Sequence, residues 1–138
     1  MNNYRYEDIE VGHKESFEVT ITQEMVDSFR GITGDVNPLH ADEDYAKGKG
    51  HPGTVVFGML TASFLSTLAG VYLPGELSLI QEVKIKFAKP VYVGDVINVE
   101  GVVDEKNDTF SLLMIKYTMK NQDGVKVMRG SMQVGAKE

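Results

Sequence analysis

The 138-residue sequence predicts an α+β fold in which a curved antiparallel sheet wraps around a long buried helix. Residues 55–71 form an uncharged stretch that is apolar on nearly all sides, which is typical of a helix enclosed in a core. Residues 83–134 hold runs rich in Val, Ile, Met and aromatic residues, separated by turn signals. A sheet built from such strands can enclose the helix, and the length suits one domain, so we expect a single domain over residues 1–138.

The N-terminal elements are a strand and a short helix. Residues 17–21 alternate between apolar and polar side chains, the period of a half-buried strand. Thr22 is a suitable helix N-cap, Glu24 falls in the favourable first turn, and Gly34 is a stop signal. The apolar side chains that share one face of this helix are Met25, Phe29 and Ile32.

Residues 35–53 interrupt the regular pattern before the central helix. Residues 35–51 read as a helix-breaking region that contains an acidic patch at 42–44, and residues 48–53 as a mobile glycine-rich loop. Residues 53–75 carry no charge, but their glycines, proline and hydroxyl groups favour a helix inside the fold over a membrane span. The charged N-terminus does not resemble a signal peptide, and we expect a cytoplasmic protein.

Four strands are expected after the central helix. Residues 83–87 alternate between apolar and charged side chains, as in a strand with one wet face. Three longer runs follow at residues 96–103, 110–119 and 125–134. The turn pairs between them are Gly94-Asp95, Asn107-Asp108 and Asp123-Gly124. An open sheet leaves unpaired edges, so we expect a homodimer.

The composition excludes several kinds of site. A formal net charge of −6 makes general nucleic-acid binding a poor fit, although a few local lysines can still meet a phosphate-bearing ligand. The chain has no cysteine, hence no disulfide and no thiolate nucleophile. Its three histidines, His13, His40 and His51, lack metal-ligand spacing, so no metal is expected.

Residues 33–42 are the most informative segment for chemistry. Asp35 and His40 are five positions apart, which on a continuous helix would turn them about 140° away from each other. Pro38 disfavours that helix, and a turn can direct both side chains to one point. An acid and a base that share one water can add it to an activated double bond or remove it. Alternatively, Asp35 only caps the turn and Asn37-Pro38 is ordinary turn chemistry.

Three segments together resemble one family. They are residues 35–40 (Asp-Val-Asn-Pro-Leu-His), residues 57–63 (Phe-Gly-Met-Leu-Thr-Ala-Ser) and residues 90–95 (Pro-Val-Tyr-Val-Gly-Asp), with Ala46 between the first two. The combination is similar to the MaoC-like dehydratases, which include the (R)-specific enoyl-CoA hydratases. This resemblance implies the hot-dog fold, in which a curved sheet wraps a long helix and two subunits join their sheets.

The resemblance also implies an activity and site residues. Family members reversibly hydrate trans-2-enoyl thioesters to (R)-3-hydroxyacyl thioesters and use no metal or redox cofactor. By position, Asp35 and His40 would be the acid/base pair, Asn37 would orient water or the loop, and the Gly58 amide would face the thioester oxygen. Ser66 would hold the aspartate, unless it is only a small residue for close packing. One departure is Phe57, which stands where many members have histidine before the helix glycine.

Two alternative functions remain at this point. The same fold serves acyl-CoA thioesterases, which typically place a carboxylate on the central helix, and residues 55–71 contain none. A non-catalytic acyl-binding module would need neither Asp35 nor His40. The substrate partner is expected to be an acyl thioester of coenzyme A or of acyl carrier protein. Candidate phosphate contacts are Lys47, Lys49, Lys86 and Lys89, and side chains that could shape an acyl pocket are Phe64, Leu65, Leu68 and Leu73.

Overall fold

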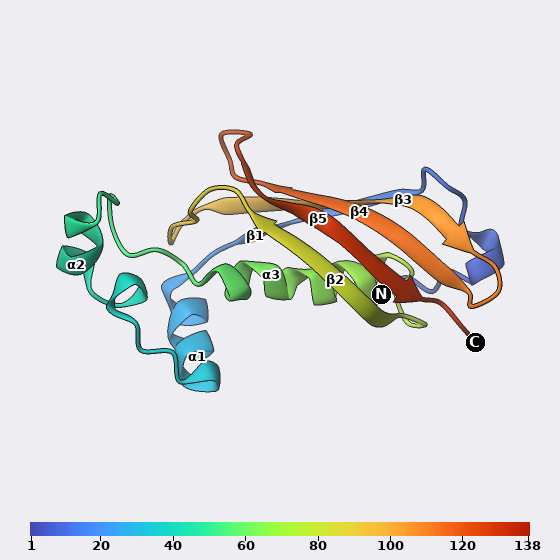
Figure 1. Cartoon of the computed structure of the whole chain (residues 1–138), viewed down its shortest axis with the longest axis horizontal. Coiled ribbons are helices and arrows are strands. Elements are labelled where there is room, and N and C mark those ends of the chain that lie inside the picture. The colour runs from blue at the N-terminus through green and yellow to red at the C-terminus, as the bar shows by residue number, and fades with distance from the viewer.

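The computed structural model describes residues 1–138 and contains a five-stranded antiparallel sheet curved over one central helix (Figure 1). The spatial strand order is β1-β3-β4-β5-β2, so β1 and β2 are the two edges. The strands are β1 (Lys14–Thr20), β2 (Leu79–Phe87), β3 (Val96–Asn107), β4 (Leu112–Lys120) and β5 (Lys126–Gly135). The expected α+β architecture is therefore confirmed.

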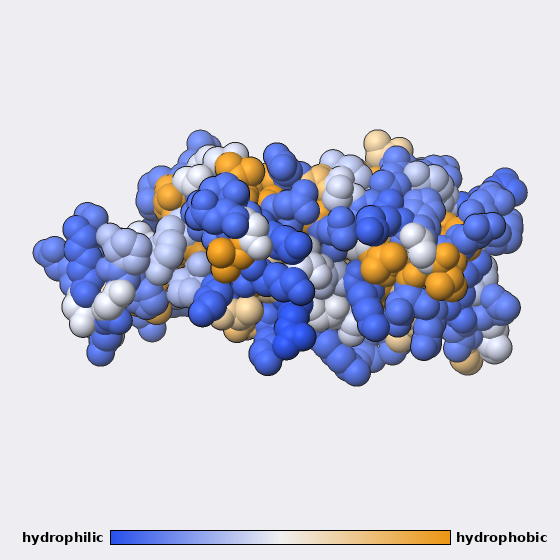
Figure 2. Space-filling view, turned by 90° about the horizontal axis from the view of Figure 1, so that it is seen from above, coloured by the Kyte–Doolittle hydropathy of each residue, from blue (hydrophilic) through white to orange (hydrophobic).

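The predicted turns join the strands as the sequence indicates. Gly94 and Gly124 have positive φ angles of 95° and 76°, which a residue without a Cβ adopts at little cost. Side chains alternate along β3 and β4, where every second residue in most of each strand is buried against the helix. The opposite face of the sheet points away from the helix. Figure 2 shows that face to be largely hydrophilic, with separate apolar patches.

The core lies between the sheet and the central helix. It contains fully buried side chains from both layers, including Leu68 of the helical layer and Ile97, Val99 and Ile115 of the sheet. Gly101 of β3 lets the two layers approach, because a Cβ there would lie 2.9 Å from Leu68 Cδ2.

Helix α1 (Gln23–Thr33) begins and ends as predicted. The Thr22 hydroxyl oxygen accepts a hydrogen bond from the Met25 amide at 3.2 Å, and Gly34 ends the helix with a φ of 71°. The predicted apolar face is only partly buried: Met25 and Phe29 pack against the core, but Ile32 is 81% exposed. The fully buried residue of α1 is Val26, which the sequence did not assign to that face.

The acidic patch at residues 42–44 forms the start of a helix, which the sequence interpretation missed. Pro38–His40 form a 3₁₀ turn, and α2 (Glu43–Gly48) follows it. The Asp42 carboxylate caps α2 by accepting the Tyr45 amide at 3.0 Å. Acidic side chains in a first turn interact favourably with the helix dipole, so the patch stabilises α2.

The central helix is shorter and less enclosed than predicted. Helix α3 spans Gly58–Thr67 and continues as a π-helical turn, Leu68–Tyr72. Residues 55–57 are not helical, because the Val55 and Val56 amides donate to the carbonyl oxygens of Leu39 and Val91. One side of α3 is exposed in the single chain, and Met59 is 58% exposed there. None of the helices combines the length and the apolar composition that a membrane-spanning helix requires.

Candidate active site

The predicted acid/base segment lies between α1 and α2, beside the N-terminus of α3 (Figure 1). The hydroxyl of Thr33 accepts a hydrogen bond from the Asp35 amide at 3.2 Å, and Asp35 Oδ1 accepts the Asn37 amide at 3.1 Å. Asp35 therefore does cap the turn, as the alternative interpretation of this segment predicted. Its second carboxylate oxygen has no partner in the chain and remains free for chemistry.

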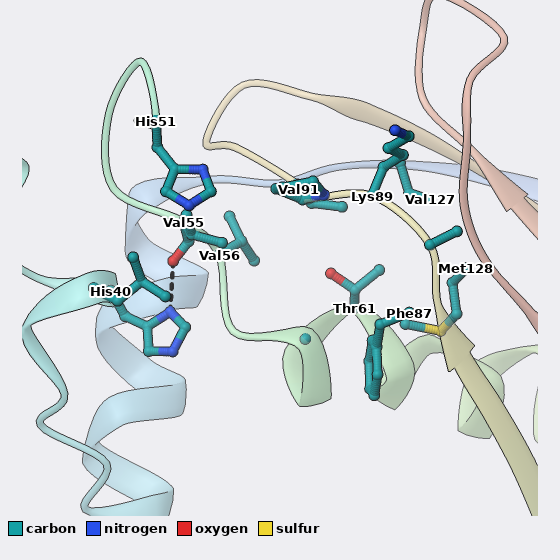
Figure 3. Close-up of a pocket in the computed structure, with 14 residues that line it drawn as sticks. His40, His51, Val55, Val56, Thr61, Phe87, Lys89, Val91, Val127 and Met128 are labelled. Atoms are coloured by element: carbon teal, nitrogen blue, oxygen red, sulfur yellow. Dashed lines mark hydrogen bonds between the residues drawn. The ribbon is translucent and has the colours of Figure 1, made fainter. Parts of the chain in front are cut away.

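The imidazole of His40 is held in one orientation. Its Nδ1 lies 2.6 Å from the Val55 carbonyl oxygen (Figure 3). Because a carbonyl oxygen can only accept, Nδ1 carries a proton, and in the neutral ring Nε2 is then the basic nitrogen. The Arg30 guanidinium donates to the His40 carbonyl oxygen at 3.0 Å and fixes the backbone of the same turn.

Phe57 supports the same imidazole. Its ring centroid lies 4.2 Å from that of His40 at an interplanar angle of 31°, and 5.2 Å from that of Phe29. The residue that departs from the family pattern is thus a buried wall behind His40. Sequence reasoning recognised the departure but not this contact.

Two neighbouring cavities share His40, Gly58 and Phe87 in their walls. The first, of about 350 Å³, also contains Asp35 and is called the Asp35 cavity. The second, of about 360 Å³, also contains Thr61 and is called the Thr61 cavity. The structure therefore brings Asp35, His40 and Gly58 together around one space.

Gly58 begins α3 where that space opens. Neither the Gly58 amide nor the Met59 amide has an acceptor in the chain, as expected for the first turn of a helix. Both N–H groups and the helix dipole favour negative charge at this end. A Cβ at Gly58 would lie 2.8 Å from the Phe87 ring, so a larger residue there would require this exposed side chain to move.

The two supporting residues have different positions. The Asn37 side chain accepts the Leu39 amide at 3.0 Å and caps the 3₁₀ turn that carries His40. Ser66 lies on the exposed side of α3, lines neither cavity and makes no hydrogen bond to Asp35 within the chain. The structure therefore groups Asn37 with the pair and leaves Ser66 apart.

A further polar contact involves His51, which lines the Thr61 cavity. His51 Nδ1 is 3.0 Å from the Tyr92 hydroxyl, and His51 and Lys89 both line the cavity (Figure 3). Burial, with a smaller contribution from the nearby Asp95 charge, raises the pKa of Tyr92. These contacts join distant parts of the chain, so no local spacing predicted them. No three acidic or histidine side chains lie close enough together to hold a metal ion.

The chain is similar to known proteins along most of its length. Residues 7–124 match the family model described as a MaoC like domain. An (R)-specific enoyl-CoA hydratase of Rhodospirillum rubrum is 36% identical over 105 residues, covering 73% of each chain. Another, from Aeromonas caviae, is 30% identical over 122 residues, covering 88% of this chain and 91% of that protein. The unliganded R-hydratase PhaJ1 of Pseudomonas aeruginosa superposes with a TM-score of 0.92 at 29% identity, covering 99% of this chain and 87% of that one. The expected hot-dog fold is thereby confirmed.

Proposed function

Because this chain belongs to the MaoC-like family, we propose that it is a hydro-lyase that reversibly hydrates trans-2-enoyl thioesters to (R)-3-hydroxyacyl thioesters. Two relatives are named as (R)-specific enoyl-CoA hydratases, which supports this reaction. The structural observation that carries the proposal is the shared cavity of Asp35, His40 and the free Gly58 amide. It combines acid/base groups with a donor for developing negative charge.

The reaction assigns a task to each group. Water attacks the β-carbon, and its lost proton passes to the Asp35–His40 pair as the C–O bond forms. The electron pair of the double bond moves toward the thioester, whose oxygen becomes enolate-like. The Gly58 amide stabilises that charge. The α-carbon then takes a proton from the same pair, and the thioester carbonyl re-forms.

Hydrolysis is not favoured by this site. A thioesterase carboxylate would be expected on the central helix, and α3 carries no acidic residue. Asp35 is the one carboxylate residue that lines either cavity. It lies beside His40, a base suited to activating water. A binding module without activity would have no need of the oriented His40 ring.

The product stereochemistry tests the proposal. We expect hydration of crotonyl-CoA to give only the (R)-3-hydroxyacyl product, because a fixed pair beside one cavity wall delivers water to one face of the double bond. The measurement follows loss of the enoyl absorbance and couples the product to an (S)-specific dehydrogenase, with the same acyl group on acyl carrier protein run in parallel. A coupled signal equal to total hydration would contradict the proposal.

We also propose that the active form of the protein is a homodimer. The edge strand β2 has one unpaired side. Four apolar side chains on β2 and α3 are exposed in the single chain, Met59 at 58%, Leu79 at 66%, Val83 at 38% and Phe87 at 52%. Met59 and Phe87 also line the Asp35 cavity, so a second copy on this face would cover the site.

Val83→Lys tests the dimer. We expect wild-type protein to show twice the 15.3 kDa chain mass in light scattering at micromolar concentration, and Val83→Lys to shift toward the monomer. The matched control is Val125→Lys, which places the same charge at the β4–β5 turn, where Val125 is 42% exposed. Wild-type protein that is entirely monomeric would refute the dimer.

A further inference from the structure

Thr61 is a buried polar residue with no hydrogen-bond partner. It lies on α3, is only 1% exposed, and its hydroxyl oxygen contacts no donor or acceptor in the chain. Buried hydroxyl groups in native proteins are nearly always paired, because an unpaired one loses its hydration without compensation. The exception at Thr61 therefore calls for a partner outside the chain.

Two other hydroxyl groups on helices of this protein, those of Thr33 and Ser63, are bonded to the preceding turn of their own helix. The Thr33 hydroxyl donates to the Phe29 carbonyl oxygen, four residues earlier, at 3.0 Å. The Ser63 hydroxyl donates to the Leu60 carbonyl oxygen at 2.6 Å. Such bonds to the preceding turn are the usual solution for Thr and Ser in helices. Thr61 does not use this solution, although the Phe57 carbonyl oxygen lies four residues before it.

The hydroxyl of Thr61 faces the cavity that it shares with the reaction site. Figure 3 shows its oxygen projecting from the first turn of α3 into the space on the side of Val56 and Val91. His40 and Gly58 line the same cavity. Helical side chains lean toward the helix N-terminus, so a residue three positions after Gly58 covers the turn that begins there. The Thr61 hydroxyl and the free Gly58 amide are thus neighbouring donors on one side of α3.

We propose that the Thr61 hydroxyl is a second oxyanion donor, which forms a hydrogen bond to the thioester oxygen of the substrate beside the Gly58 amide. The assignment rests on the proposed hydration reaction. Negative charge grows on this oxygen as water adds to the β-carbon and disappears when the α-carbon is protonated. Thr61 keeps its proton throughout. Its bond strengthens while the charge is present, which lowers the barrier.

Thr61→Val tests the hydroxyl without changing the shape of the side chain. We expect this variant to lower kcat by about 10²-fold, the usual effect of removing one oxyanion donor, and to change KM much less. Thr61→Ser keeps a hydroxyl and should restore most of the lost rate. The matched control is Thr67→Val, the same substitution on the same helix at a residue that lines neither cavity.

Stability separates this role from a structural one. Because the hydroxyl has no partner in the free protein, Thr61→Val should leave the unfolding temperature unchanged or raise it. A fall in unfolding temperature together with a proportionate loss of activity would show that the hydroxyl serves the fold, and would overturn the proposal. If Thr61→Val does not fold, Thr61→Ala provides the same comparison. A folded valine or alanine variant with the wild-type kcat would also overturn it.

A binding measurement distinguishes failure of this inference from failure of the proposed function. Acetoacetyl-CoA can bind as an enolate, whose negative charge is shared between the thioester oxygen and the ketone oxygen and gives an ultraviolet band. Wild-type protein and Thr61→Ser should develop this band and Thr61→Val should not. A wild-type protein that hydrates no enoyl thioester would refute the proposed function, while the band still decides the role of Thr61. Equal bands in wild type and Thr61→Val would refute that role.

Discussion

Replacing Asp35 with Asn, or His40 with Ala, should lower the rate of crotonyl-CoA hydration by about 10²- to 10⁴-fold. Water is a weak nucleophile, so it needs a base as the C–O bond forms, and the α-carbon needs a proton afterwards. The two side chains border one cavity, and one carboxylate oxygen of Asp35 is free. His40 is fixed through Nδ1, which leaves Nε2 for proton transfer. The measurement is kcat/KM for each single variant.

The double variant shows whether the two residues act as one unit. If Asp35 and His40 serve the same water, the loss in the double variant should be far smaller than the product of the two single losses. Circular dichroism and light scattering provide the controls for fold and assembly. Folded, dimeric single variants with near-wild-type rates would contradict the mechanism and favour a protein that only binds acyl thioesters.

Gly130→Ala should lower the free energy of unfolding by about 3 kcal/mol or more. A Cβ at this position would lie 1.9 Å from the Lys84 carbonyl oxygen and 2.6 Å from the Tyr117 hydroxyl. Strands β2 and β5 would have to separate, and Tyr117 would lose its 2.7 Å bond to that carbonyl. Burial raises the pKa of Tyr117 to about 12, so this hydroxyl is a neutral donor at the pH of the assay.

Urea unfolding followed by circular dichroism measures the effect. Gly31→Ala is the matched control, because Gly31 lies inside α1 and a Cβ there meets no atom within 4 Å. Alanine is the better helix former by up to about 1 kcal/mol, so the control should be neutral or more stable. Equal stability of Gly130→Ala and wild type would show that β2 is not held against β5 as described.

Local chemistry made much of the fold predictable. Strand alternation, the Thr22 cap and the Gly34 stop each depend on a few adjacent residues, and all three are present in the structure. The central helix was predicted from its apolar composition, but its start was not. Hydrogen bonds from residues 55–56 to Leu39 and Val91 delay the helix until Gly58, and these partners are distant in sequence.

Some residues of the candidate site could likewise be predicted from the sequence, and others could not. Asp35 and His40 were found because one proline-containing turn holds both, and the structure places them on one cavity. The His51–Tyr92 contact joins residues 41 positions apart, and only the folded chain reveals it. Thr61 lies within the 57–63 motif, but the sequence assigned it no role, since a threonine in an apolar helix looks like any small core residue. Its missing hydrogen bond is a property of the packed structure.

The acceptor that orients His40 is the main-chain carbonyl of Val55, so it does not depend on which side chain stands at position 55. Any residue at position 55 supplies the same oxygen, so point mutation cannot delete the partner of the imidazole. Only a shift of the backbone can, and that backbone is tied to Leu39 on one side and, through Val56, to Val91 on the other. The position of the proton on the His40 ring is therefore unaffected by substitution of the Val55 side chain. Substitutions of the side chain at position 55 therefore leave the acceptor of the imidazole in place.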